Sequence, residues 1–200
     1  MKITDVEIPQ KLSGRPKDRR GYPIPWTVLI DENGNPHFAI NDEFRRHRAI
    51  SEKRCPLCGG SLGSYMWFAG GPKSAFDPRG AYYDPPMHRE CCHYALRVCP
   101  YLALPSYAGR IDEKSLAAKG SKINAGLFDP TQDAARPEVF VALSTRQYAT
   151  TKTAAGLFGF LRPQRPYLAI ELWKEGARID PEDRLWKMHA TLIGGVINDS

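Results

Sequence analysis

The chain has 200 residues, of which 42% are hydrophobic, and its net charge at pH 7 is +6. This length and composition predict a single globular domain and exclude a disordered chain. The 17 glycines and 17 prolines indicate short elements joined by many loops. The modest excess of Lys and Arg favours contact with polyanions only weakly.

A membrane protein or a secreted disulfide scaffold is not expected from this sequence. Its apolar runs are all shorter than the roughly 18 residues that cross a bilayer, and the stretch Met1–Glu7 lacks the apolar core of a signal peptide. The five cysteines form an odd number and cluster in patterns typical of metal ligands. We therefore expect a cytoplasmic protein.

The first recognisable elements lie before the cysteines. The basic, breaker-rich segment Gly14–Gly21 predicts an exposed N-terminal arm over residues 1–22, and a solvated loop is a simpler interpretation of it than a nucleic-acid contact. The apolar runs Trp26–Ile30 and His37–Ile40 flank an Asn-Gly pair at Asn33 and Gly34. This pattern predicts a β-hairpin.

A short helix is predicted to follow this hairpin. Asn41 or Asp42 can cap it, and it is expected to continue to about Ile50, with Phe44 and Ile50 on its buried side. Its remaining side chains are expected to point largely outward and to form the most basic face of the protein: Arg45, Arg46, His47 and Arg48.

The strongest chemical signal is a set of cysteine and histidine residues between Cys55 and Cys99. Cys55 and Cys58 form a C-x-x-C turn followed by two glycines, and His88 and Cys91 lie three residues apart. Three sulfur ligands and one imidazole are a set that closes a tetrahedral Zn²⁺ site. A redox dithiol is the alternative for the C-x-x-C pair, but Gly-Gly follows it where such motifs open a helix.

The segments between and after these ligands have their own patterns. Ser64–Ala69 predicts a buried strand, and Ala81–Tyr83 a weaker extended piece that could pair with it. Asp84 with two following prolines predicts the start of a helix that continues to Cys99. His88 and Cys91 would then project from its first turn, with Cys92 as an alternative fourth ligand.

A C-x-x-C knuckle, paired strands and a helix that donates the second ligand pair resemble a treble-clef zinc finger over residues 55–99. The usual second pair in that family is C-x-x-C, and here His88 takes its first position. The resemblance implies a structural Zn²⁺. Two stretches, Trp67–Phe76 and Tyr94–Leu102, also look like segments found in proteins of bacteria and their phages, a resemblance that implies no function.

The C-terminal half predicts a second layer around this module. A helix is expected over Asp112–Lys119, strands over Val139–Leu143 and Tyr167–Trp173, and a long loop or irregular hairpin over Thr145–Pro166. Asp180 is the first residue of a typical helix N-terminus, which predicts a final helix after it. The whole chain therefore predicts one α+β domain, with a small antiparallel sheet and short helices around the zinc module and with C-terminal strands and a helix over residues 138–200.

We expect binding rather than catalysis, with nucleic acid as the first candidate partner. Basic residues lie next to the knuckle in sequence, and four aromatic residues could stack on bases: Tyr65, Trp67, Tyr82 and Tyr83. The cations predicted to contact nucleic acid, together with the arm, are Arg45, Arg46, Arg48, Lys53 and Arg54.

Two alternatives remain open at this point. A treble clef suggests an HNH-type nuclease, but the required catalytic pattern is missing, and only Asp77, Asp84 and His93 could replace it. Four protein ligands also leave zinc no open position for a water molecule. The other alternative is a protein-interaction accessory factor of phage or bacterial type, with Arg162–Pro166 as a contact loop.

Overall fold

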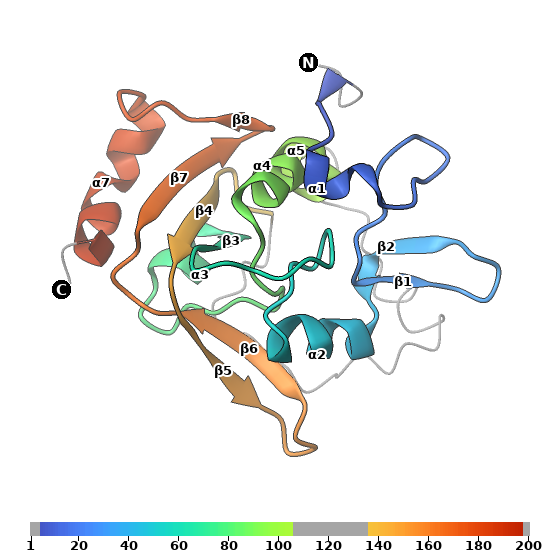
Figure 1. Ribbon diagram of the computed structural model, residues 1–200. Coiled ribbons are helices and arrows are strands. Elements are labelled where there is room, and N and C mark those ends of the chain that lie inside the picture. The colour runs from blue at the N-terminus through green and yellow to red at the C-terminus, as the bar shows by residue number, and fades with distance from the viewer. Residues whose placement is uncertain (1–4, 106–135, 198–200) are drawn as a thin grey trace.

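The computed structural model describes residues 5–105 and 136–197 of the chain (Figure 1). Its helices are α1 (Gln10–Ser13), α2 (Glu43–Ser51), α3 (Pro72–Phe76), α4 (Arg89–Val98), α5 (Pro100–Ala103) and α7 (Arg184–Ile197). Its strands are β1 (Val28–Ile30), β2 (Pro36–Asn41), β3 (Met66–Gly70), β4 (Phe140–Thr145), β5 (Tyr148–Lys152), β6 (Phe158–Pro163), β7 (Ala169–Lys174) and β8 (Ala177–Arg178). The mixture of short helices and small antiparallel sheets confirms the α+β class.

The centre of the fold is a four-stranded antiparallel sheet in the order β3-β4-β7-β8. Every residue of β4 is buried, because this strand has neighbours on both edges and packed layers on both faces. Two further antiparallel pairs, β1 with β2 and β5 with β6, project as hairpins away from the sheet (Figure 1). Successive side chains of β4 point to opposite faces, so one strand contributes to two cores.

The two cores lie on opposite faces of this sheet. On one face, Phe68, Leu143 and Leu172 pack with residues of α2, α3, β6 and α7. On the other, Trp67, Ala142 and Trp173 pack with α1 and α4. The second core also contains Cys55 and Cys91, so the predicted zinc ligands lie against the sheet rather than in a separate module.

Several predicted elements agree with the structure. The N-terminal hairpin is present as β1 and β2, with Gly34 at φ +81° in its turn. The side chain of Asp42 caps α2 by accepting a hydrogen bond from the Arg45 amide at 3.1 Å. The segment Thr145–Pro166 is an irregular hairpin, because β5 and β6 pair with a register shift between Thr150 and Lys152.

The pairing expected around β3 is wrong. β3 pairs with β4, more than seventy residues later, and Tyr82 of the weaker extended piece instead forms a bridge with Leu161. The helix predicted from Asp84 begins later, at Arg89, because the backbone of Met87 is hydrogen-bonded to Trp67 as a short extension of the sheet. Its predicted end before Pro100 is correct.

The expected orientation of α2 is partly wrong. Phe44, expected in the core, is 72% exposed, whereas Arg46, expected on the basic surface, is fully buried. The burial of Ile50 is as predicted. Periodicity alone assigned the apolar Phe44 to the interior, but the space under α2 is polar because three backbone carbonyls point into it.

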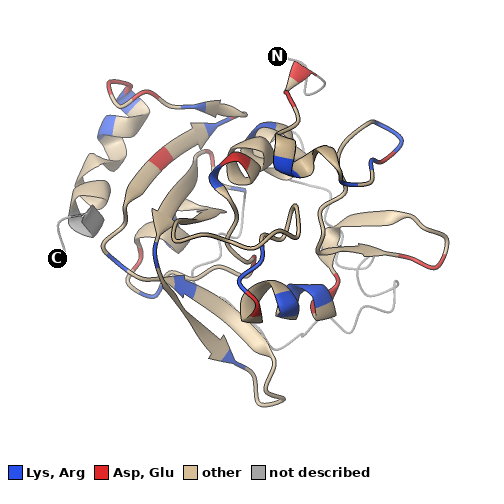
Figure 2. Cartoon of the chain, viewed as in Figure 1, with Lys and Arg blue, Asp and Glu red and all other residues tan. Residues whose placement is uncertain are grey.

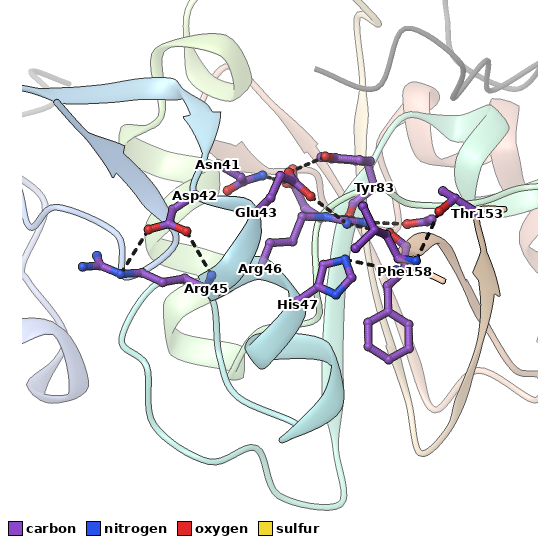
Figure 3. A network of polar contacts seen from close by, with 12 residues as sticks. Asn41, Asp42, Glu43, Arg45, Arg46, His47, Tyr83, Thr153 and Phe158 are labelled. Atoms are coloured by element: carbon purple, nitrogen blue, oxygen red, sulfur yellow. Dashed lines mark hydrogen bonds and ion pairs between the residues drawn. The ribbon is translucent and has the colours of Figure 1, made fainter. Parts of the chain in front are cut away.

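Arg46 connects three distant parts of the chain (Figure 3). Its guanidinium donates to the carbonyl of Tyr83 at 2.8 Å, to that of Phe158 at 2.9 Å and to that of Gly159. It also lies 3.8 Å from the centroid of the Tyr83 ring, and Glu43 is 3.4 Å away. A buried charge needs partners of this kind, so Arg46 is a structural residue.

The elements predicted within residues 106–135, including the helix over Asp112–Lys119, lie outside the described part of the chain. In the N-terminal segment that was expected to be an exposed arm, Leu12 is buried and Asp18 accepts hydrogen bonds from the amides of Arg20 and Tyr22. The basic segment Gly14–Gly21 is mostly exposed, as expected, but it is an internally hydrogen-bonded loop with buried residues on either side at Leu12 and Ile24.

A buried carboxylate lies where α4 crosses the sheet. Glu171 of β7 is 5% exposed, and its carboxylate lies 2.7 Å from Nε2 of His93 in α4. The geometry of this close contact does not make an aligned hydrogen bond, whereas the indole of Trp173 does donate to Glu171 at 3.1 Å. Arg89 and Arg178 are also within 4 Å.

Replacement of Arg46 by Met should destabilise the protein strongly. The carbonyls of Tyr83, Phe158 and Gly159 would lose a buried donor, which is expected to cost about 3 kcal/mol or more. The measurement is chemical denaturation. The control is Arg45→Met on the same helix, which removes a partly exposed ion pair and should cost about 1 kcal/mol or less; equal losses for both variants would contradict the structural role of Arg46.

Glu171 should make stability depend on pH in acid. Burial alone would raise the pKa of Glu171, but His93 and Trp173 outweigh it and lower that pKa. The stabilisation is therefore present above the unfolded pKa of about 4.3 and is lost as the pH falls through the lower folded value.

The free energy of unfolding of Glu171→Gln should be lower than that of the parent at neutral pH, and the gap should narrow in acid. Subtracting one protein from the other cancels effects that they share, such as metal loss. Glu138→Gln is the control, because Glu138 is 67% exposed and its ion pair among the described residues is the surface pair with Lys174. A gap that is constant with pH would refute the role of the carboxylate charge.

Candidate metal centre

The first ligand pair lies in a tight turn before β3. The Cys55 amide donates to the Gly60 carbonyl at 2.8 Å, and the Gly59 amide donates to the Cys55 carbonyl at 2.8 Å. The Gly60 amide points at the Cys58 sulfur, 3.4 Å away. Amides directed at sulfur stabilise its thiolate form, so this turn is prepared for a cation.

Gly59 is required in this turn for two reasons. Its φ of +79° lies in the left-handed region that favours glycine. A Cβ atom there would also lie 3.0 Å from the ring of Trp26, which packs against the turn. The backbone of Trp26 and Thr27 is hydrogen-bonded to Leu57 and Pro56, so these two residues hold the turn and do not belong to β1.

The second ligand pair lies at the beginning of α4. His88 is the N-cap residue of this helix and Cys91 lies in its first turn. His88 was expected inside the helix, and its position one step earlier follows from the pairing of Met87 with Trp67. The pairing ends at Met87, so the chain turns from the sheet edge into the helix at His88.

The four predicted ligands are brought together. The ligand atoms of Cys55, Cys58, His88 and Cys91 all lie within 4.8 Å of one another, and such a group could hold a metal ion. Nδ1 of His88 is 3.3 Å from the Cys58 sulfur and 4.0 Å from the Cys91 sulfur. A tetrahedral zinc ion with bonds of about 2.3 Å to sulfur separates its ligand atoms by roughly 3.8 Å, so the set closes with small movements.

The hydrogen bond on the far side of the His88 ring selects the nitrogen that would bind the metal. Nε2 lies 3.0 Å from the carbonyl oxygen of Ser61, which can only accept. Nε2 therefore carries the proton, and the lone pair of Nδ1 points toward the three sulfurs. Ser61 could not be identified from the sequence, because the acceptor is a backbone carbonyl that every residue type possesses.

The three cysteines of this cluster differ in the direction in which their pKa values are shifted. Burial alone would raise the pKa of Cys55, but hydrogen bonds from Cys58, Cys91 and His88 outweigh it and the pKa is lowered. The hydrogen bond to Cys55 raises the pKa of Cys58. Hydrogen bonds to Cys55 and to Cys58 raise the pKa of Cys91. Sulfurs this close ionise together only when a cation compensates their charge, so metal binding here would release protons.

Cys92 and Cys99 do not belong to the group of ligand atoms. Cys92 is completely buried in the core between α4 and the sheet, and this burial raises the pKa of its thiol. Burial likewise raises the pKa of Cys99. Both thiols are protonated, and Cys92 belongs to a hydrophobic cluster with Trp67 and Trp173.

The cations predicted to contact nucleic acid are mostly bound within the protein. α2 carries several of them (Figure 2), but Arg46 is buried. Arg45 donates to the Trp26 carbonyl and pairs with Asp42. Both Arg48 and Arg54 pair with Glu52, whose pKa these two hydrogen bonds lower to about 2. Lys53 is exposed in the turn after α2.

The predicted stacking residues differ in exposure. Trp67 is 6% exposed and Tyr82 is 5% exposed, so their rings belong to the two cores. Tyr83 lies against Arg46, and its hydroxyl donates to Glu43 at 2.5 Å. Tyr65 is 57% exposed, so its ring is the one of the four that a base could reach.

The residues that a nuclease reading would need have other partners. Asp77 accepts hydrogen bonds from Arg79, and Asp84 accepts one from Asn41 at 3.0 Å. His93 pairs with Glu171. In the described ranges, no second group of metal-binding side chains accompanies the Cys55 cluster.

No family model matches the chain, and neither the curated proteins nor the solved structures contain a significant match. Among the described helices, none has the length and apolar character needed to cross a membrane. The site therefore has to be interpreted from its own geometry.

Two adjacent cysteines provide a sharp test of the ligand set. Cys91→Ala should abolish stoichiometric zinc, because it removes one of the three converging sulfurs and leaves only three of the four ligands. Cys92→Ala should keep zinc and lose only the stability of a small buried side chain. Elemental analysis of both purified variants measures this, and zinc loss on Cys92→Ala with retention on Cys91→Ala would reverse the assignment.

Proposed function

We propose that the chain is a zinc-stabilised binding protein whose partner is nucleic acid. The observation that carries the structural-zinc part is the convergence of Cys55, Cys58, His88 and Cys91. Three thiols and an oriented imidazole match zinc in softness and number. Zinc in such a site would connect the turn before β3 to the start of α4.

The donor set favours a structural rather than a catalytic ion. Four protein ligands fill a tetrahedral shell, and a catalytic zinc needs an open position for water. Cys55 and Cys91 are fully buried, which also keeps solvent from most of the shell. The residues of this chain would therefore hold the ion in order to fix the backbone, and the function would lie on the surface that it fixes.

Nucleic acid is the partner that the charge favours. The chain carries 28 Lys and Arg against 22 Asp and Glu, and exposed cations and aromatic rings lie near the metal centre. Phosphate contacts by such cations give an affinity that falls steeply with salt. A protein-interaction factor is the second candidate, favoured by the exposed Met188 and Leu192 one helical turn apart on α7.

One titration tests both parts of the proposal. Purified protein should contain one zinc ion per chain and should bind a labelled oligonucleotide at low salt, with affinity that falls as salt rises. A strong chelator should lower the melting temperature and abolish binding, because metal binding is linked to folding.

The readouts separate the two parts. A protein that is purified without metal and melts at the same temperature with and without chelator would refute the proposed structural zinc. Zinc-loaded protein that does not bind the oligonucleotide at low salt would refute nucleic acid as the partner and favour the hypothesis of a protein partner.

A further inference from the structure

A groove of about 600 Å³ lies beside the metal centre, where α4 leaves the sheet uncovered. Three strands form its floor. Trp67 of β3 is paired with Ser144 of β4, which is paired with Ala169 of β7, so these residues form one row across the sheet. Lys11 of α1 and Arg89 of α4 line the walls.

The floor of this groove contains a polar group without a partner. Ser144 is 3% exposed, and its hydroxyl makes no hydrogen bond to any described residue. Other buried polar side chains of the same sheet are paired: Thr145 donates to the carbonyl of Gln164, and Glu171 accepts from Trp173. A hydroxyl that lines a groove and makes no hydrogen bond to a described residue is available to a ligand.

Lys11 of this groove is paired at 2.7 Å with Glu90, which also lines the groove, but Arg89 in the groove and Arg146 beside it are less neutralised than the arginines of α2. Arg146 follows β4 directly, and its side chain is in no ion pair in the described part of the chain. Arg89 is 61% exposed, and its nearest carboxylate, Glu171 at 3.7 Å, is shared with Arg178 and His93. Each described arginine of α2, in contrast, has a carboxylate within 3.5 Å, as do Arg45 with Asp42 and Arg48 with Glu52.

An exposed aromatic ring lines the groove beside Arg146. Tyr65 lines the groove and is 57% exposed, and the Arg146 guanidinium lies 5.6 Å from the centroid of its ring. On the floor, Arg89 lies 5.6 Å from the ring of Trp67. An exposed aromatic ring next to one cation, with a second cation in the same groove, is chemistry that can bind a base together with its neighbouring phosphates.

We propose that this groove binds a single-stranded polynucleotide, with a base on Tyr65, phosphates on Arg146 and Arg89, and the Ser144 hydroxyl bonded to sugar or base. The assignment deepens the nucleic-acid role proposed above and rests on it. It moves the contact surface from α2 to the other side of the metal centre, to the groove between the sheet and α4.

A single strand fits these observations better than a duplex. Stacking on Tyr65 needs an open base face, and base pairs within a duplex hide theirs. A duplex is recognised by an element that enters a groove of the nucleic acid. α4, which borders this groove, has its middle packed on the sheet through Cys92 and Leu96, so it cannot enter one.

The test compares two double variants of equal charge in the zinc-loaded, full-length protein. Arg89→Ala with Arg146→Ala should weaken binding of a labelled oligothymidylate or oligouridylate about tenfold and reduce the salt slope by about 0.7 per lost phosphate contact. Arg45→Ala with Arg48→Ala should change affinity less than about twofold, because those cations are already neutralised. Separate measurements with DNA and with RNA strands show whether the sugar affects affinity. Binding of either strand that depends on Arg89 and Arg146 supports the groove as the binding site.

Tyr65 provides a second comparison that does not change charge. Tyr65→Ala should weaken binding by roughly fivefold or more, and Tyr65→Phe should retain it, because stacking needs the ring and not the hydroxyl. Zinc content and melting temperature check that each variant is folded. Arg146→Ala alone serves if the Arg89 variant loses zinc, because Arg146 lies outside the metal centre.

Three results would overturn the assignment. The α2 variant could weaken binding as much as the groove variant, Tyr65→Ala could bind like the parent, or an unlabelled duplex could compete as well as the single strand. In each case the parent protein still binds nucleic acid, so the proposed function would stand and the groove would be the wrong location for the binding site. A parent protein that binds neither strand at low salt removes the function and the location together.

Discussion

Two backbone hydrogen bonds between Trp67 and Met87 determine where the halves of the metal centre meet. The Trp67 amide donates to Met87 at 2.9 Å, and the Met87 amide donates back at 2.7 Å. Because Met87 is fixed at the sheet edge, His88 leaves that edge beside the turn that contains Cys55 and Cys58. The same pairing sets the start of α4 and, through Trp67, the floor of the groove. The site, the helix and the groove thus share one support.

The sequence predicted the local features of this arrangement well. Ligand spacing identified the four residues that converge, and one of the two glycines noted after the C-x-x-C pair, Gly59, has a positive φ in the turn. Turn and cap residues located β1, β2 and α2. These features succeed because each depends on a few neighbouring residues, whose geometry and hydrogen bonding follow from residue type.

The sequence could not predict which distant segments meet. β3 pairs with β4 rather than with the nearby Tyr82, because completing a buried sheet outweighs the cost of closing a longer loop. Arg46 was assigned to the surface because its charge is normally exposed, and the three carbonyls that bind it lie on two segments distant in sequence, at Tyr83 and at Phe158–Gly159. Charge in a sequence therefore does not predict charge on a surface, and the groove cations are identified only once their partners are known.

The long pairing of β3 has a consequence for synthesis on the ribosome. All four candidate metal ligands and β3 itself precede β4, and the carbonyls of Phe158 and Gly159 that bind Arg46 emerge later still. While residues 71–139 are being translated, the edge of β3 that will pair with β4 has no strand beside it. Open strand edges on nascent chains are where neighbouring polypeptides on a polysome can join by mistake. The risk of such incorrect strand pairing therefore lasts until the ribosome has synthesised β4.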